Sequence, residues 1–149
     1  MKNYMQQAYD LALKAQDLDE VPVGAVIVNY EKNEVVGRGL NLTRSDHDPS
    51  AHAEIVDLRD AGKNTGSARM PQCDIYVTLE PCPMCAQALS IARIRRIYFG
   101  AYDPKSGGVA HGAKIFNATS CHHKPVTCGG LESEKCGDIL RQFFRQKRR

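Results

Sequence analysis

Apolar residues follow two spacings near the start of the chain, and these spacings predict local structure. Over residues 3–16 they recur every three or four positions, which is typical of an amphipathic helix. The segment Val21–Val28 is almost continuously apolar and β-branched, so it predicts a buried strand. After a turn at residues 29–33, Glu34–Gly39 can return as the second arm of a hairpin. The apolar positions of the first helix are Tyr4, Ala8, Leu11, Ala12 and Ala15.

The remaining segments alternate between helical and extended patterns, which predicts an α/β protein with helices on both faces of its sheet. No internal repeat, linker or low-complexity segment interrupts them, so we expect one domain over residues 1–149. The predicted elements are a helix over about 51–60, a loop over 61–71, a strand over 74–79, a helix over 83–93, a strand over 96–100, a glycine-rich loop over 103–112, a short strand over 126–128 and a helix over 132–146.

Composition narrows the class of protein. The chain has 149 residues, of which 42% are hydrophobic and 25% charged, as in ordinary globular proteins, and this excludes wholesale disorder, a fibrous repeat and a coiled coil. No apolar run approaches the roughly 18 residues of a membrane span. The segment Met1–Gln7 lacks the apolar core of a secretory signal. We therefore expect a cytoplasmic protein with no membrane partner.

The net charge of +3 is small, but its distribution is uneven. Residues 141–149 carry five positive charges and no acid, and Arg93–Arg96 is a second basic cluster. Such clusters can face phosphate groups. They can equally serve solubility and complement a helix C-terminus, so charge alone does not identify a partner.

Two short motifs carry the strongest chemical signal. His52 precedes Glu54 in an Ala-His-Ala-Glu segment, and Cys82 and Cys85 lie in Pro-Cys-Pro-Met-Cys. One imidazole and two thiolates are ligands that suit zinc. Three protein ligands leave a fourth tetrahedral position for water, which is the arrangement of a catalytic rather than a structural zinc site.

The spacing of these residues predicts where they sit. Cys82 and Cys85 are three residues apart, so at the start of a helix they share a face, and Pro83 is tolerated in that first turn. His52 and Glu54 are two apart and would diverge in mid-helix, so they converge only at a helix mouth. There Glu54 can exchange protons with metal-activated water.

Each of these residues alone has a more ordinary interpretation. A single histidine is usually a surface or core residue, a Cys-x-x-Cys pair is often structural or redox-active, and a single glutamate is usually a solvated charge. Together, His-x-Glu followed by Pro-Cys-x-x-Cys is the signature of zinc-dependent deaminases.

These motifs and several others resemble the bacterial tRNA-specific adenosine deaminases, a family of the cytidine deaminase superfamily. The likeness covers nearly the whole chain. Guanine deaminases share the zinc motifs, so the discriminating segments lie around and after them. The segments that carry the resemblance are Val21–Val26, Asp46–Pro49, Tyr76–Cys82, Phe99–Gly107 and Phe143–Arg145.

The resemblance implies a three-layer α/β/α fold with a central mixed sheet of about five strands. It implies one Zn²⁺ per chain, held by His52, Cys82 and Cys85, and hydrolytic conversion of adenosine to inosine at the tRNA wobble position. The usual substrate is an arginine tRNA with an ACG anticodon. Zinc hydroxide would attack C6 of the purine, while Glu54 protonates N1 and then helps ammonia leave.

The resemblance further implies a substrate surface and a homodimer. The partner would be a tRNA anticodon stem-loop, whose flipped base can stack on apolar and aromatic groups. The base pocket would be lined by Val23, Asn41, Ala53 and Leu79. The neighbouring nucleotides would be contacted by Asp103 and Lys105. The residues that pack on the RNA side of the site would be Phe143, Phe144 and Arg145.

Simpler roles compete with some of these assignments. Asn41 and Asp103 are also typical turn residues, and at least one of Phe143 and Phe144 should be buried in the core. His122-His123 stands where the family often has Asn-His, which leaves any contact of that asparagine open. The spacings of the other cysteines fit no zinc pattern, so we expect small buried hydrophobes at Cys73, Cys121, Cys128 and Cys136.

Two other functions remain open from the sequence. One is a deaminase of a free base or nucleoside, against which the basic tail and the segment around Asp103 argue. The other is a zinc module that binds RNA without catalysis, in which Glu54 would be only a surface charge.

Overall fold

The computed structural model describes residues 2–148 of the chain. The helices and strands alternate much as the hydrophobic pattern predicts. In chain order they are α1 (Tyr4–Asp17), β1 (Gly24–Asn29), β2 (Glu34–Leu40), α2 (Ala53–Thr65), β3 (Cys73–Leu79), α3 (Pro83–Ile91), β4 (Arg96–Ala101), the 3-10 helix η1 (Ile115–Asn117), β5 (Val126–Cys128) and α4 (Ser133–Lys147).

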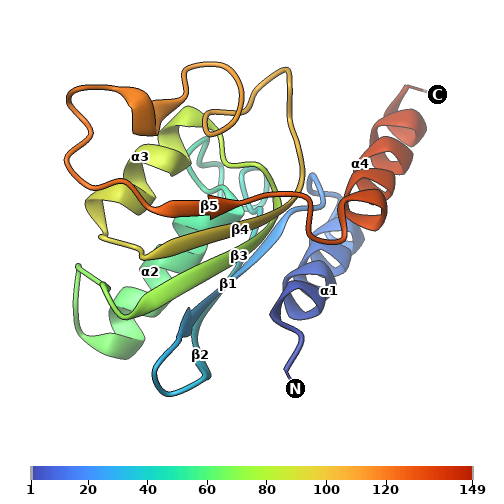
Figure 1. Cartoon of the computed structure of the whole chain (residues 1–149). Coiled ribbons are helices and arrows are strands. Elements are labelled where there is room, and N and C mark those ends of the chain that lie inside the picture. Colours follow the sequence, from blue (N-terminus) through green and yellow to red (C-terminus); the bar gives the residue numbers. More distant parts are fainter. Residues whose placement is uncertain (1, 149) are drawn as a thin grey trace.

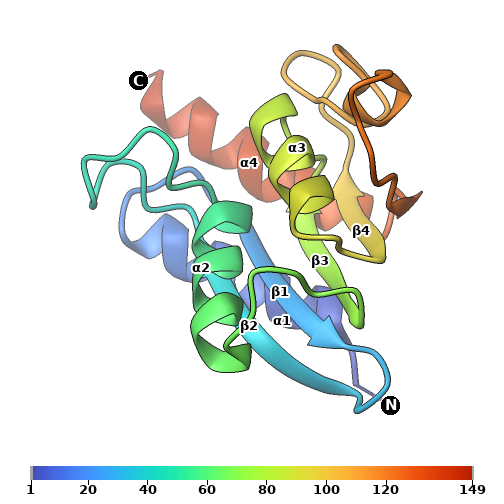
Figure 2. The ribbon, with the colours of Figure 1, turned by 90° about the vertical axis from the view of Figure 1, so that its left-hand side faces the viewer.

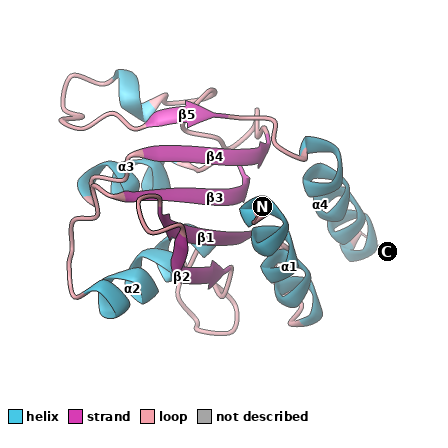
Figure 3. Cartoon of the chain, turned by 60° about the horizontal axis from the view of Figure 1, so that its bottom comes forward, coloured by secondary structure: helices cyan, strands magenta, loops and turns pink. Residues whose placement is uncertain are grey.

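The strands form a five-stranded mixed sheet in the order β2-β1-β3-β4-β5, and Figure 3 shows them one above another in this order. β1 is antiparallel to both β2 and β3, whereas β4 is parallel to both β3 and β5. Helices α2 and α3 cover one face of the sheet and α1 and α4 cover the other (Figures 1 and 2). The predicted three-layer α/β/α arrangement is therefore confirmed.

Strand β1 lies between two buried layers. Its alternate residues point to opposite faces, so Val26 and Val28 pack toward α1 while Ala25 and Ile27 join the core on the other side. All four are at most 3% exposed. This double burial explains why the segment is continuously apolar instead of alternating with polar residues.

The predicted strand at 21–28 began too early. Pro22 lacks the N–H that a central strand needs, and the backbone N–H of Val23 donates to the Val21 carbonyl at 2.9 Å in a tight turn. Regular pairing starts only at Gly24. The turn leaves Val21 and Val23 at the end of the sheet and not within it.

The predicted loop at 61–71 was wrong in its first part, because α2 continues to Thr65. Ala61 is fully buried against the sheet, so another turn of helix is stabilised by packing. The helix ends at Gly66, which adopts a left-handed backbone with φ +70° and donates its N–H to the Gly62 carbonyl at 2.9 Å. The helix therefore ends at a glycine, a common signal for a helix C-terminus that is visible in the sequence.

A glycine on β2 allows α2 to approach the sheet closely. A Cβ atom at Gly39 would lie 2.2 Å from the carbonyl oxygen of Ala53 and 2.5 Å from the backbone nitrogen of Asp57. Neither backbone atom can move without displacing the helix. Gly39 thus fixes the distance between β2 and the first turn of α2.

The segment between β4 and α4 departs most from regular structure. It contains η1, which the sequence pattern did not predict, and the short edge strand β5 at its predicted position. Within residues 2–148, no helix is both long enough and apolar enough to cross a membrane.

One charged side chain is buried without compensation. Asp57 on α2 is completely inaccessible, and neither carboxyl oxygen has a hydrogen-bond partner. Burial raises the pKa of Asp57 well above its usual range, and the nearby Asp60 and Glu54 act in the same direction. A buried, unpaired carboxyl group of this kind costs free energy of folding.

Replacing Asp57 by Asn should therefore stabilise the protein at neutral pH. The folded state holds the Asp57 proton more tightly than the unfolded state, so its stability falls as pH rises above about 4. Asp57→Asn removes this loss, and we expect a gain of about 1–3 kcal/mol at pH 7 that shrinks toward pH 4. Urea unfolding at both pH values measures it, with the exposed Asp46→Asn as control. A gain independent of pH would contradict the prediction.

Candidate metal centre and base pocket

Two helices of the same layer begin at one end of the sheet, close to where β3 ends. His52 immediately precedes α2 and Cys82 immediately precedes α3, both with extended backbone. Pro83 occupies the first helical position, where its missing N–H costs nothing. Neither His52 nor Cys82 uses its side chain to cap its own helix. Both side chains are therefore available to bind another group, as the motif spacing predicts.

His52, Cys82 and Cys85 bring their ligand atoms together. The Nδ1 atom of His52 lies 3.5 Å from Sγ of Cys82 and 3.6 Å from Sγ of Cys85. All three atoms lie within 4.8 Å of one another, and residues 2–148 contain no second group of this kind. Tetrahedral zinc, with bonds of about 2.3 Å to sulfur and 2.0 Å to nitrogen, holds N and S about 3.5 Å apart. The donor set therefore fits zinc in both chemistry and spacing.

The electrostatics of this group favour a thiolate. A hydrogen bond from the Cys85 thiol, with a further one from His52, lowers the pKa of Cys82 to about 4 although burial opposes it. The same hydrogen bonds raise the pKa of Cys85 and of His52. A thiolate at a helix N-terminus also gains from the unpaired N–H groups there. Ligands of this type bind metal in their deprotonated form, so the fold favours the metal-binding form at Cys82, whereas Cys85 and His52 must release any proton they hold when a metal binds.

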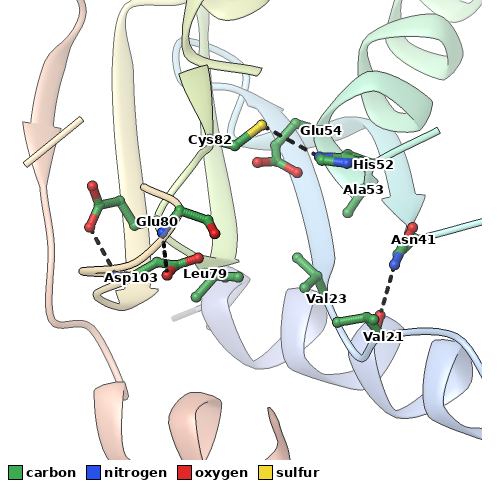
Figure 4. A pocket seen from close by; sticks show the side chains of 11 residues that line it. Val21, Val23, Asn41, His52, Ala53, Glu54, Leu79, Glu80, Cys82 and Asp103 are labelled. Atoms are coloured by element: carbon green, nitrogen blue, oxygen red, sulfur yellow. Dashed lines mark hydrogen bonds between the residues drawn. The ribbon is translucent and has the colours of Figure 1, made fainter. Parts of the chain in front are cut away.

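Glu54 lies in the first turn of α2 beside these ligand atoms. It is 4% exposed, and Figure 4 shows its carboxyl group between Cys82 and His52. Burial raises the pKa of Glu54 to about 7, and the negative Cys82 acts in the same direction. Glu54 is therefore not a solvated charge on a helix surface, which was the more ordinary interpretation of this residue from the sequence. It lies where a proton acceptor and donor for a reaction next to the metal would have to lie.

A pocket of about 170 Å³ opens beside the candidate metal centre. It collects residues from both helix starts, from the turn before β1 and from the ends of β2, β3 and β4 (Figure 4). All four residues predicted to line a base pocket are among them, together with Asp103. The lining residues are Val21, Val23, Asn41, His52, Ala53, Glu54, Leu79, Glu80, Cys82, Asp103 and Ser106.

Three lining residues, Val21, Glu80 and Ser106, were missed from the sequence. Each is separated by no more than three positions from a residue that was named, so the motifs contained the signal. What the pattern did not show is that the chain reverses at each of these positions. Such reversals expose consecutive side chains to one cavity.

Asn41 and Asp103 also form turns, as their alternative interpretation held. The Nδ2 group of Asn41 donates to the Val21 carbonyl at 3.3 Å, and its Oδ1 accepts from the Thr43 N–H at 3.2 Å. Oδ1 of Asp103 accepts from the Ser106 N–H at 3.0 Å. A turn role and a position on the pocket wall thus coexist in both residues.

A second, wider hollow of about 700 Å³ adjoins the first and shares Val21, Leu79, Asp103 and Ser106 with it. Lys105 and Phe144 line this hollow, with Arg141 and Arg148 of the C-terminal region. Its wall therefore combines the aromatic rings of Tyr102 and Phe144 with three positive charges.

The remaining predicted RNA-side residues lie elsewhere. Phe143 is only 6% exposed and packs edge-on against Phe144, with ring centroids 5.5 Å apart, so one of the two rings is buried as predicted. Arg145 is exposed and does not line either hollow.

The cysteines outside the motif are mostly small core residues. Cys73, Cys121 and Cys136 are buried, as predicted. Cys128 is exposed, so its predicted burial was wrong. It lies on β5, a three-residue edge strand whose residues are all exposed.

Comparison with known proteins gives the geometry its context. Residues 1–101 match the family described as the cytidine and deoxycytidylate deaminase zinc-binding region. The tRNA-specific adenosine deaminase of Agrobacterium fabrum is 49% identical over 146 residues, which cover 98% of this chain and 95% of that protein. The enzyme of the same name from Haemophilus influenzae is 42% identical over 97% of this chain and 83% of its own length.

The chain belongs to the tRNA-specific adenosine deaminases. A solved structure from a study of A-to-I editing by tRNA:A34 deaminases at the wobble position is 47% identical to this deaminase, with a TM-score of 0.89. The match between the two covers 92% of this chain and 98% of the chain in that structure. A guanine deaminase from Nitrosomonas europaea has a TM-score of 0.81 at 17% identity, so it shares the fold of the deaminase.

We predict that the deaminase binds one zinc ion through the three converging side chains. Cys85→Ser should reduce the bound zinc to less than about a tenth of that in the parent protein, because a serine hydroxyl does not replace the thiolate ligand that zinc prefers. Cys128→Ser is the matched control, since this thiol is exposed on β5. Metal analysis of the purified variants tests this, and equal zinc content in both would contradict it.

Proposed function

We propose that the protein is a zinc-dependent enzyme that converts adenosine to inosine at the wobble position of tRNA, with an ACG-anticodon arginine tRNA as substrate. The observation that carries this proposal is the position of Glu54, buried in a pocket beside the His52, Cys82 and Cys85 ligand atoms. Relatives named tRNA-specific adenosine deaminases support the substrate class. We assign the whole activity to one domain, residues 1–149.

His52, Cys82 and Cys85 would hold the zinc. When bound, zinc supplies Lewis-acid activation of a water molecule near neutral pH. Nδ1 of His52 already lies 3.5 Å from Sγ of Cys82 and 3.6 Å from Sγ of Cys85, so little rearrangement is needed when zinc binds. The position of both groups at helix N-termini keeps them in place against the sheet.

Glu54 would move the protons of the reaction. It accepts a proton from the attacking water and delivers it to N1 of the adenine. C6 gains the water oxygen, and Glu54 then takes the second proton from that oxygen and passes it to the exocyclic nitrogen. The bond between C6 and that nitrogen breaks, ammonia leaves, and the C6 carbonyl of inosine remains. Its burial keeps bulk water away from these transfers, and its attachment to the first turn of α2 fixes it beside His52.

The pocket beside Glu54 would receive the flipped base. Val23, Ala53 and Leu79 offer apolar contacts for the faces of the ring, and Asn41 offers an amide for its polar edge. Because the pocket is narrow at about 170 Å³, it suits one base and not a stacked pair. A deaminase must take its target base out of the stack to reach C6.

The adjoining hollow would hold the rest of the anticodon stem-loop. Asp103 and Lys105 lie on one side of it and Phe144 on the other, so neighbouring nucleotides can meet both polar and aromatic groups. Arg145 on the exposed side of α4 would add a phosphate contact, and Phe143 would support the ring of Phe144 from beneath.

We further propose a homodimer in the cytoplasm, where tRNA is processed. The surface of α3 supports this, since Met84 and Ile91 are 40% and 61% exposed although both are large and apolar. Exposed apolar residues of this size on one helix favour contact with another protein surface.

A deamination panel tests the substrate. The purified protein is incubated with an ACG-anticodon arginine tRNA, with the same tRNA carrying G at the wobble position, and with free adenosine, cytidine and guanine. We expect inosine only at the wobble adenosine, measured by nucleoside mass spectrometry after digestion. Turnover of a free base with the tRNA left intact would overturn the proposal. No turnover of any substrate by zinc-loaded protein would favour an RNA-binding module without catalysis.

Glu54→Gln tests the proton role. The amide keeps the shape but cannot accept the proton of the water, so we expect kcat to fall by about 10²–10⁴-fold while the zinc content stays that of the parent. Glu31→Gln in the exposed turn between β1 and β2 makes the same chemical change far from the pocket, and it should leave kcat unchanged. If the Glu54→Gln enzyme keeps more than a tenth of the parent rate, Glu54 does not carry the protons.

The two adjacent rings on α4 should separate binding from stability. Phe144→Ala removes a 44% exposed ring, so we expect KM for the stem-loop to rise about tenfold with little change in unfolding free energy. Phe143→Ala removes a buried ring and should destabilise the fold by about 3–5 kcal/mol. Kinetics and urea unfolding of both variants measure this, and equal effects of the two on both quantities would contradict it.

A further inference from the structure

Glu80 is a buried carboxylate that neither the proposed proton transfers nor the proposed metal binding uses. It follows β3 directly, and its side chain is completely inaccessible. Five donors converge on it from one loop: the backbone N–H groups of Asp103 (3.0 Å), Val109 (3.2 Å), Ala110 (2.9 Å) and His111 (3.1 Å), and Nδ1 of His111 (2.8 Å). We call these groups and Glu80 the Glu80 clasp.

The clasp closes a loop onto the start of α3. Residues 103–111 encircle the carboxylate so tightly that a Cβ atom at Gly107 would lie 2.3 Å from its Oε2 atom. One residue later, a Cβ atom at Gly108 would lie 2.5 Å from the nitrogen of Pro83. The Gly108 N–H also donates to the Pro81 carbonyl at 2.8 Å. The loop is thus pressed against the backbone next to Cys82.

The same loop supplies part of the pocket wall. Asp103 and Ser106 line the pocket beside the candidate metal centre, and Lys105 lines the adjoining hollow. The pairing of β3 with β4 ends just before this loop, where the Glu80 N–H donates to the Ala101 carbonyl at 2.8 Å. No helix or strand runs through residues 103–111. The position of this wall therefore depends on hydrogen bonds of the loop, five of which belong to the clasp, and not on secondary structure.

The two carboxylate oxygens have different roles. Oε2 accepts the three consecutive N–H groups of residues 109–111, whereas Oε1 accepts from Asp103 and from the His111 ring. An ionised carboxylate can accept at both oxygens, but an amide can accept at only one. Glu80→Gln would therefore keep one half of the clasp and place an NH₂ group against the N–H donors of the other half.

We infer that Glu80 is a positioning residue for the proposed reaction: through the clasp, completed by His111, it holds residues 103–111 where Asp103 and Ser106 can contact the RNA. This inference rests on the proposed function, because the bound RNA is what the wall contacts. Although Glu80 lies at the pocket wall, its side chain is inaccessible and both of its carboxylate oxygens are bonded to the loop. It acts on substrate binding through the loop.

The test compares Glu80→Gln with Asp74→Asn in the zinc-loaded protein. Asp74 lies at the opposite end of β3, is buried, and accepts two hydrogen bonds from Arg95, at 2.9 and 2.7 Å. Its conversion to the amide is the matched chemical change away from the pocket. Three quantities are measured for each variant: amide hydrogen exchange of peptides over 103–111, zinc content, and kcat and KM with the ACG stem-loop.

For Glu80→Gln we expect exchange over 103–111 to accelerate at least about tenfold, because hydrogen bonds to a charged acceptor are lost. KM should rise about tenfold, with kcat changed less than about threefold and zinc content kept. Asp74→Asn should leave exchange over 103–111 and KM as in the parent. Equal effects of the two variants would overturn the inference. So would loss of zinc and kcat together in Glu80→Gln, since Glu80 would then serve the metal centre.

His111 provides a second route if Glu80→Gln does not fold. His111→Ala removes one of the five hydrogen bonds and leaves the backbone donors, so the same changes should appear at about threefold. His111→Asn returns a side-chain NH₂ donor and should restore part of the loss, which an effect of cavity or packing alone would not show. If amide exchange over 103–111 is unchanged in His111→Ala, the imidazole does not help to hold the loop, and that part of the inference is overturned. Hydrogen exchange needs no substrate, so failure of the tRNA panel would reject the proposed function without deciding whether the clasp holds the loop.

Discussion

The site depends on one constraint: two helices of the same layer begin at the same point. The first N–H groups of a helix have no partners within it, and aligned peptide dipoles place partial positive charge there. Two such ends in contact repel each other unless negative groups lie between them. The Cys82 thiolate and the Glu54 carboxyl group occupy this space. The same arrangement that makes the packing tolerable therefore collects the ligands and the acid.

Close packing fixes the geometry to within the tolerance that the chemistry requires. Gly39 allows the first turn of α2 to touch β2, and Gly108 allows the loop after β4 to touch the first turn of α3. A Cβ atom at either position would lie 2.5 Å or less from a backbone atom of α2 or α3, so the start of that helix would have to shift. The lack of a side chain at Gly39 and at Gly108 thus helps to set the positions of the two helix starts.

Much of this could be predicted from the sequence, and the failures have specific causes. Periodicity identified the main helices and all five strands, and the two-residue spacing of His52 and Glu54 predicted a helix mouth. It did not predict that α2 continues to Thr65, because the burial of Ala61 is a tertiary effect. The role of Glu80 was hidden for the same reason: its five donors come from residues 23 to 31 positions later.

The buried acids show how stability and chemistry are divided in this chain. Glu20 accepts hydrogen bonds from the Arg44 and Ser45 backbone N–H groups, and Glu80 accepts five, so burial of these carboxylates is compensated and each fixes a loop. Asp57 has no partner and lies one helical turn from Glu54. Burial raises the pKa of both. Because a raised pKa means that the charged form is disfavoured, the first two turns of α2 carry an electrostatic cost that the loops do not. That cost falls at Glu54, the group that we propose takes up and releases protons, where an acid stabilised as its anion would be a poor proton donor.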